Sequence, residues 1–425
     1  MKKICLTVVG LYLTLLQAFS QSAIKDTTIE PAKDSPIAYI TKPLKLDDIN
    51  LVSSYYNQTG NHSSVTGGIG TENVTDISTG LELKFITTDN DGYKYTLTTG
   101  LGIDHHTAAS SAYVNKSGAS KTGGSRVYPS ISYSEENKNG TVKGIGLYYS
   151  AEYNYHSFAV DANYSRKMGS GGELSTKFSA YFDKVKLIYP SELIPTSTVS
   201  SGTTVITSAS GRTTSYGGGG SSSSSIPSSP RYTYTGSLAY SQIINKNLQA
   251  SLLLDLVAQN GYLSLPFHRV YFADATEKVE ALPDLRYKLP IGFRLNYFMG
   301  DNVIIRSYYR YYTDYWGISA HTASLEVPVK LTPFFSVSPF YRFYTQTAST
   351  YFAAYQKHVT SDKYYTSNYA YSAFSSSYYG VGIHLAPPGG IWKTALSSIE
   401  IRYGHYSQTT DLNSNIISFN FQFKQ

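Results

Sequence analysis

Apolar and polar side chains alternate along most of the chain, in segments of about ten residues or slightly more. From Leu285 to Tyr297 almost every second residue is apolar or aromatic, and Lys288 and Arg294 stand among the residues between them. Side chains on a β-strand point alternately to opposite sides, so this pattern predicts strands with one apolar and one polar face. Such segments recur at 46–57, 74–87, 93–105, 126–135, 142–153, 156–166, 173–187, 232–243, 248–259, 285–298, 303–313, 321–331, 334–346, 376–386, 397–407 and 414–424.

The connections between these segments alternate in length. Tight turns rich in Gly, Asn, Asp and Pro are expected at 89–92, 137–140, 169–172, 245–247, 300–302, 332–333 and 387–390. Long loops are expected between them, at 58–73, 106–125, 188–231, 260–284 and 347–375. Short turns on one rim and long loops on the other are typical of outer-membrane barrels. We therefore predict an all-β, antiparallel, up-and-down transmembrane barrel of about sixteen strands, with fourteen or eighteen as alternatives.

Composition supports a barrel and excludes other classes. The 425 residues include 41 Tyr and 34 Gly, and only 15% are charged. No run of 18 apolar residues follows the N-terminus, which excludes a helical membrane protein. The net charge of +6 is too small to indicate nucleic-acid binding.

The N-terminus indicates export. Residues 1–20 have a basic start, an apolar stretch and a small-residue cleavage site, which is the pattern of a secretory signal peptide. The only cysteine, Cys5, lies within it. Residues 21–44 then form a short polar periplasmic lead, and the barrel occupies 45–425. We expect the mature protein in the outer membrane of a Gram-negative bacterium, in contact with lipid and inserted by the barrel-assembly machinery.

Two long loops differ in character. The 188–231 loop is rich in Ser and Gly and cannot bury enough apolar surface to fold, so we expect it to be flexible and exposed to the cell surface. The 260–284 loop is aromatic and contains Pro, so we expect it to be ordered and to fold inward over the mouth. The residues that would occlude the barrel are Tyr262, Leu263, Pro266, Phe267, Arg269 and Tyr271.

Charged residues on the predicted inner faces offer a second candidate site. Arg294, Arg306, Arg310 and Arg342 could form a cationic strip that guides anions. Glu326 and Asp314 lie near them in sequence and could neutralise them. We favour this second interpretation, a charge-paired wall that keeps the barrel round.

Signals for catalysis and for metal binding are weak. His105 and His106 are adjacent on a predicted strand, so their side chains point to opposite faces and make a poor metal site. His321 could form hydrogen bonds with Asp314 or Arg310, which is a structural role. We expect no enzymatic activity, no metal and no cofactor.

Two stretches carry a family resemblance. The first reads Gly261-Tyr-Leu-Ser-Leu-Pro266-Phe-His-Arg-Val-Tyr271, and the second reads Tyr309-Arg-Tyr-Tyr-Thr-Asp314-Tyr-Trp316-Gly317 and ends in His321-Thr322. Both resemble a Gram-negative outer-membrane family, domain of unknown function 3570, most closely over about 232–346. In that family Trp316, Gly317 and His321 belong to a shared structural motif. The resemblance implies a barrel whose genes often neighbour those of a flavin-attaching transferase, a thioredoxin-like protein and a small lipoprotein.

Three functions follow as hypotheses. The first is a channel or transport-type barrel with a partly occluded lumen. The second is a non-conducting scaffold that binds an envelope lipoprotein or periplasmic redox proteins, as the resemblance implies. The third and most distant is an outer-membrane hydrolase.

Overall fold

The computed structural model describes residues 43–107, 123–193, 198–200, 203–207, 213–217 and 226–424. The predicted signal peptide 1–20, nearly all of the lead 21–44 and much of the Ser/Gly-rich stretch of loop 188–231 lie outside these ranges. Within the described residues, no helix has the length and apolar character needed to cross a membrane.

Strands dominate the described chain. Those of the wall are β1 (Lys45–Thr59), β2 (Val74–Thr88), β3 (Lys94–His106), β4 (Gly124–Glu136), β5 (Val142–Glu152), β6 (Tyr155–Met168), β7 (Gly172–Lys186), β11 (Ser228–Asn245), β12 (Leu248–Gly261), β15 (Leu285–Met299), β16 (Val303–Asp314), β17 (Ser319–Glu326), β18 (Val329–Thr332), β19 (Phe335–Gln346), β20 (Phe374–Leu385), β21 (Leu396–Gln408) and β22 (Asn413–Lys424).

The loops contain shorter elements. These are the strands β8 (Thr198–Ser200), β9 (Thr203–Thr207) and β10 (Thr213–Gly217), which form a small sheet, and β13 (Arg269–Tyr271) and β14 (Glu277–Val279), which form a hairpin. The described residues also contain four single-turn 3₁₀ helices: η1 (Ser64–Thr66), η2 (Ser191–Leu193), η3 (Tyr369–Tyr371) and η4 (Ile391–Lys393).

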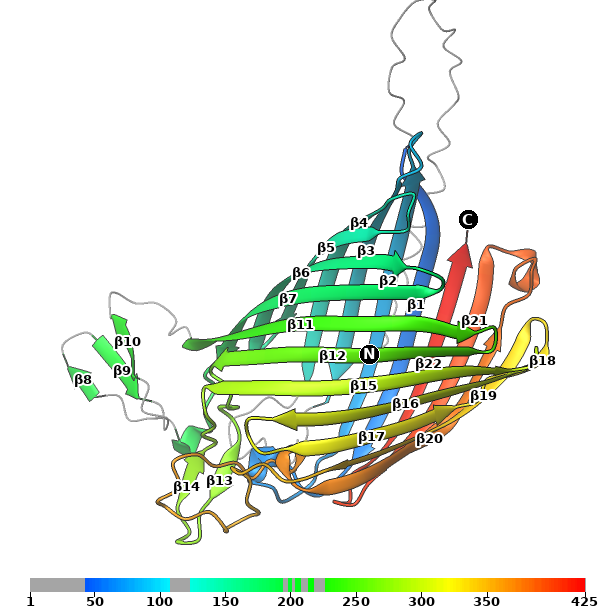
Figure 1. Cartoon of the computed structure of the whole chain (residues 1–425). Helices are drawn as coiled ribbons and strands as arrows, with labels where there is room; N and C mark the ends of the chain where they lie inside the picture. Colours follow the sequence, from blue (N-terminus) through cyan, green and yellow to red (C-terminus); the bar gives the residue numbers. More distant parts are fainter. Residues whose placement is uncertain are drawn as a thin grey trace, which may run out of the picture. The chain divides into compact units, whose positions relative to one another are not determined.

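The wall closes on itself. Each strand pairs antiparallel with its neighbour in the chain, and β1 pairs with both β2 and β22 (Figure 1). β17 and β18 occupy one position, because both pair with β16 and β19. The result is a closed transmembrane barrel of 16 strand positions, which confirms the predicted fold class. Closure leaves no strand edge unpaired, which a lipid environment requires.

One predicted strand is interrupted. The 321–331 segment was expected to be continuous, but its ladder breaks at Val327 and Pro328, between β17 and β18. Proline has no N–H to donate to a ladder, so a break at this position is expected on chemical grounds.

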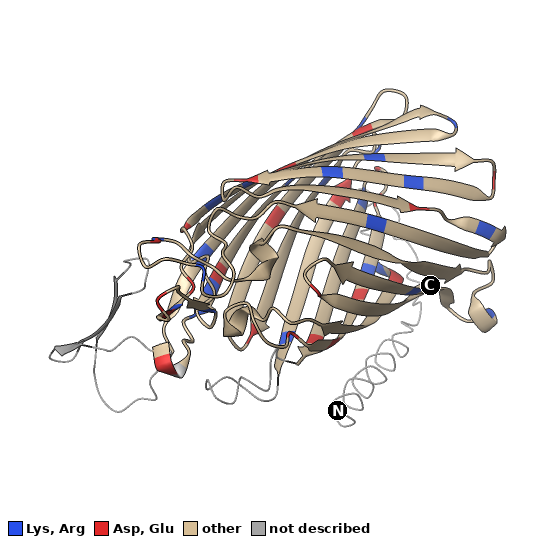
Figure 2. Ribbon diagram, turned by 90° about the horizontal axis from the view of Figure 1, so that it is seen from below, with Lys and Arg blue, Asp and Glu red and all other residues tan. Residues whose placement is uncertain are grey.

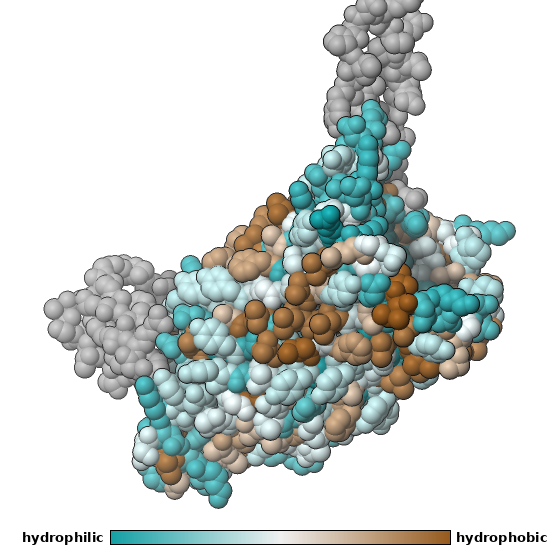
Figure 3. All heavy atoms as spheres, viewed as in Figure 1, coloured by the Kyte–Doolittle hydropathy of each residue, from teal (hydrophilic) through white to brown (hydrophobic). Residues whose placement is uncertain are grey.

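The two faces of the wall follow the alternation in sequence. Phe293 and Leu325 are 44% and 45% exposed on the outer face, where an apolar band lies between more hydrophilic ends (Figure 3). Charged residues of both signs occur along the strands (Figure 2). Arg310 pairs with Gly292 across strands, and its neighbours Tyr309 and Tyr311 pair with Phe293 and Ile291, so Arg310 faces the lumen.

The two ends of the barrel differ. The connection between β2 and β3 is the tight turn 89–93, and the other turns at that end include 137–141 and 300–302. The opposite end carries the loops 60–73, 262–284 and 347–373. Both clusters of buried apolar residues found among the described residues lie at this loop end. Both clusters are therefore built mainly from the loops at this end.

Candidate functional site

Loops from distant parts of the wall meet over one mouth of the barrel. Loop 60–73 follows the first wall strand and loop 262–284 follows the ninth, so they start half the circumference apart. They nevertheless touch: Ser64 Oγ lies 3.0 Å from His268 Nε2, and Arg269 Nη1 donates to the Val65 carbonyl at 2.7 Å. We call residues 60–73, 187–193, 262–284, 315–318 and 347–373 the cap (Figure 1).

A buried glutamate joins three segments of the cap. Glu280 is 3% exposed, and its Oε2 accepts a hydrogen bond of 2.8 Å from the Leu265 amide. Its Oε1 accepts from the Thr366 hydroxyl of loop 347–373 and lies 3.5 Å from His268 Nδ1. The chain Ser64–His268–Glu280–Thr366 therefore connects three loops. A carboxylate buried this deeply would be costly without these donors, so the network holds the loops together.

The same residue types, in the order Ser, His and Glu, occur in serine hydrolases. Here the His268–Glu280 contact is long for a hydrogen bond, and Glu280 Oε1 is shared with Thr366. The network bridges the junction between loops, and we assign it a structural role as a latch.

Two apolar clusters give the cap its own core. Val270, Phe272, Ala281 and Tyr365 form one cluster, and their rings include an edge-on contact of 4.9 Å between Phe272 and Tyr365. Leu263, Leu282 and Trp316 form the other, with Tyr351 and Tyr371 packed against it. Burial raises the pKa of the Tyr365 and Tyr371 hydroxyls to about 12. Both clusters combine residues of different loops, so each loop depends on the others for its conformation.

All six residues predicted to occlude the barrel lie in the cap, and all are buried or half-buried. Arg269 pairs with Glu192 of η2 at 2.6 Å and with Glu277 at 3.2 Å. Burial raises the pKa of Tyr271 to about 12 and that of Tyr262 well above its ordinary value. These residues hold the cap together from within.

The Trp-Gly motif anchors the cap to the wall. Trp316 is 1% exposed, its Nε1 donates to the Leu285 carbonyl at 3.0 Å, and the Arg286 guanidinium lies 4.3 Å above its ring. Asp314 Oδ1 accepts from the Trp316 amide at 2.9 Å, and Asp314 Oδ2 pairs with Arg286. Gly317 has φ +85° and a Cβ there would lie 2.7 Å from Thr350 Oγ1, so the turn requires glycine.

His321 lies elsewhere. It pairs with Tyr311 across strands and faces outward, where its Nδ1 lies 2.7 Å from the Tyr309 hydroxyl. Asp314 and Arg310 face inward, so the expected contacts with His321 are not made. The reason is register: residues 309 and 311 point to the face opposite to residues 310 and 314.

A basic recess lies in the lumen wall. It has a volume of about 570 Å³ and is lined by four arginines and one glutamate: Arg294, Arg306, Arg342, Arg402 and Glu326. Glu326 pairs with Arg306 at 3.3 Å and with Arg402 at 3.1 Å. Arg402 also contacts Glu400 at 3.0 Å. Glu326 and Glu400 together thus balance Arg306 and Arg402, and the surplus positive charge of the recess lies on Arg294 and Arg342.

The remaining arginines have aromatic partners in place of acidic ones. Arg294 lies 5.8 Å from the Tyr308 ring and Arg342 lies 4.9 Å from the Tyr378 ring. Arg310 Nε is buried and makes no hydrogen bond to any described residue. No ion pair to Arg294, Arg310 or Arg342 occurs within the described ranges. The expected neutralisation by Asp314 does not occur, because Asp314 is bound to Arg286 at the end of the strand.

Sequence reasoning missed the latch and a group at the rim of the mouth. His268, Glu280 and Thr366 are brought together by tertiary contacts between loops, and no spacing rule predicts them. Asp76, Asp104 and His106 lie together on adjacent strands. The i, i+2 spacing of Asp104 and His106 was a usable signal for part of this group.

The chain is similar to one protein family and to several solved structures. The sequence matches the family described as "Protein of unknown function (DUF3570)" over residues 106–415. None of the curated proteins compared matches it. Among solved structures, Pseudomonas aeruginosa OpdQ is similar with 9% identity and a TM-score of 0.41, over 89% of this chain and 98% of that chain.

A bacterial polysaccharide outer membrane secretin has 8% identity and a TM-score of 0.46, with coverage of 89% and 98%. Pseudomonas aeruginosa OccD3 (OpdP) has 8% identity and a TM-score of 0.42, with coverage of 90% and 95%. Similarities of this degree carry no information about activity. The family match, in contrast, extends over most of the residues, and the chain belongs to the DUF3570 family.

Proposed function

We propose that the protein is a transport-type barrel of the outer membrane, with a lumen that takes small organic anions and a mouth closed by the cap. In this proposal the signal peptide is removed on export and the barrel is inserted by the assembly machinery, with the loops toward the cell surface. The observation that carries the proposal is the surplus of arginine in a lumen recess below a latched cap.

The recess suits carboxylate or phosphate groups. Guanidinium groups bind both in a two-pronged geometry, and they remain charged at any physiological pH. Arg294 and Arg342 are held over tyrosine rings, which positions the guanidinium groups without neutralising them. An anion in the recess could therefore bind to Arg294 and Arg342, because neither forms an ion pair with a described carboxylate.

The cap supplies the gate. Polar contacts join loop 60–73 to loop 262–284 across the mouth, namely Ser64–His268 and the hydrogen bond from Arg269 to the Val65 carbonyl. Contacts of this kind can be exchanged for contacts with water at low net cost, unlike the ladder of the wall. Opening would therefore proceed by separation of the loops while the wall remains intact.

Solute selectivity tests the proposal. A variant lacking residues 262–272 should open the mouth, and liposomes carrying it should admit organic anions faster than cations of matched size. Adding Arg342→Gln should reduce this preference. Lys84→Gln removes the same charge from the inner face of β2, which does not line the recess, and should reduce it less.

Equal rates for anions and cations in the opened variant would contradict the proposal. No flux of any solute through the opened variant would favour the second hypothesis, a non-conducting scaffold with partners in the cell envelope.

A further inference from the structure

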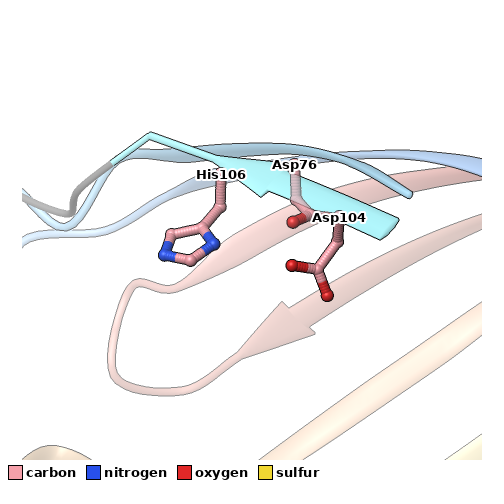
Figure 4. A group of neighbouring side chains, drawn as sticks. All are labelled: Asp76, Asp104 and His106. Atoms are coloured by element: carbon pink, nitrogen blue, oxygen red, sulfur yellow. The ribbon is translucent and has the colours of Figure 1, made fainter. Parts of the chain in front are cut away.

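Three metal-binding side chains converge on the inner face near the capped mouth. Asp104 and His106 are two residues apart on β3, so both face the lumen, and Asp76 of β2 is the cross-strand partner of His106. Their candidate ligand atoms all lie within 4.8 Å of one another. Figure 4 shows the imidazole ring and both carboxylates on the same side of the two strands.

Asp104 has an unsatisfied oxygen. The residue is 5% exposed, and its Oδ2 accepts hydrogen bonds from Arg126 Nη2 at 2.6 Å and Nε at 2.8 Å. Its Oδ1 is buried and has no hydrogen-bond partner among the described residues. Arg126 is on β4, on one side of β3, and Asp76 is on β2, on the other side. Asp104 Oδ1 is thus free to bind a metal ion that Asp76 also binds.

His106 has a fixed tautomer. Its Nε2 lies 3.3 Å from Glu152 Oε1 on β5, so in the neutral ring Nε2 carries the proton and Nδ1 carries the lone pair. Metal-binding histidines commonly donate their second N–H to a carboxylate in this way. One ring nitrogen of His106 faces the two carboxylates in Figure 4. The imidazole is therefore oriented as a ligand before any metal arrives.

Charge at this position also favours a cation. Asp76, Asp104 and Glu152 bring three acidic groups, and apart from His106 itself Arg126 is the only basic residue that pairs with any of them within the described ranges. Two carboxylates at short range repel each other unless a proton or a cation lies between them. Asp76 makes no ion pair to a described residue, so its charge is unbalanced.

We propose that Asp76, Asp104 and His106 bind one divalent transition-metal ion, with Zn²⁺ as the best fit, at the rim of the barrel mouth. Imidazole nitrogen and carboxylate oxygen are ligands of Zn²⁺ at about 2.0–2.2 Å, and three protein ligands leave a position for water. Ligand atoms at that distance in tetrahedral geometry lie about 3.4 Å apart, so the side chains would close by at most about 1.4 Å. Arg126 and Glu152 are positioning residues that orient the ligands.

Zn²⁺ titration of the folded protein tests the assignment. Full-length protein in detergent is stripped with a chelator, and binding is followed by calorimetry. We expect one strong site in the unaltered protein and a loss of affinity of at least about tenfold in Asp76→Asn and in His106→Gln. His105→Gln is the matched control, because His105 is on the same strand but faces outward.

Folding is checked by heat-modifiability on gels, and Asp76→Asn leaves the Asp104–Arg126 pair intact. A Co²⁺ titration adds a spectroscopic measure of nitrogen ligation that should disappear in His106→Gln. Two results would overturn the proposal: no strong Zn²⁺ binding by the unaltered protein, or equal binding by His106→Gln and His105→Gln.

Discussion

The wall and the cap are stabilised in different ways. In the wall, side chains alternate between lipid and lumen, and a continuous ladder of backbone hydrogen bonds holds the strands together. In the cap, Trp316, Phe272 and Val270 are almost fully buried, as in the core of a soluble domain. The wall is therefore stabilised by the surrounding lipid and by closure of its hydrogen-bond ladder, while the cap is stabilised by packing between loops.

This difference implies different stabilities. A closed barrel has no edge at which unfolding can begin, whereas the cap can separate along its loop junctions. We expect the cap to open while the wall stays folded. A transport barrel with a gate needs this order of stabilities.

Trp316→Ala should have the largest effect and should act on the cap alone. Removing a fully buried Trp costs about 3–5 kcal/mol, and the ring also packs under Arg286. Hydrogen exchange should accelerate in residues 262–284 and 347–373 and stay unchanged in β1 to β7. Trp392 is 84% exposed, so Trp392→Ala is the matched control. Loss of protection in the wall as well would show that the two regions unfold together.

Phe293→Arg should act on the wall alone. Its side chain is exposed on the outer face, and a charge near the bilayer midplane costs about 2–4 kcal/mol. Unfolding by denaturant in lipid vesicles measures the cost. Ser132→Arg places the same side chain on the inner face of β4 and should be tolerated. A neutral result for Phe293→Arg would mean that the assignment of the faces is reversed.

Removing the latch should weaken the cap less than removing its core. His268→Ala leaves Glu280 without one partner, which costs about 1–3 kcal/mol for a buried polar group. Ser64→Ala removes only a partly exposed hydroxyl and should cost about 0.5–1.5 kcal/mol. Exchange rates of the cap amides would rank the two variants. If Ser64→Ala has the larger effect, the latch is not organised around Glu280.

The smallest effect concerns pH. Glu72 lies in the cap, and burial raises its pKa from 4.5 to about 7, against the opposing field of His268. The folded cap then binds a proton that the opened cap releases, so cap stability is fully present below about pH 4.5 and falls as pH rises toward 7. Glu72→Gln should flatten this dependence between those values. If the rate of hydrogen exchange in the cap depends on pH in Glu72→Gln as it does in the unaltered protein, another group causes the pH dependence.

The wall could be predicted from sequence because its information is local. Leu325 and Phe293 face lipid as the period of two requires, and sixteen segments closed as expected. Pro328 shows the limit even there, since the hydrophobic pattern continued across a break in the ladder. Strand position and face thus follow from neighbours in the chain.

The cap could be predicted only in part. The composition of 260–284 indicated order, but Ser64, His268 and Thr366 come from three loops and meet only after folding. Nearness in sequence predicts that Asp314 pairs with the lumen arginines, whereas the turn at Trp316 directs it to Arg286. The partners of charged residues in loops are determined by tertiary contacts, and these contacts leave no periodic pattern in the sequence.

Single-channel recording in planar bilayers tests the central claim most directly. The protein with its cap should pass little or no current, because loops from opposite sides of the wall meet over the mouth. The variant lacking residues 262–272 should pass a steady current, carried mainly by anions because of Arg294 and Arg342. A large, steady current from the unaltered protein would contradict the account of a wide wall closed by a separate cap.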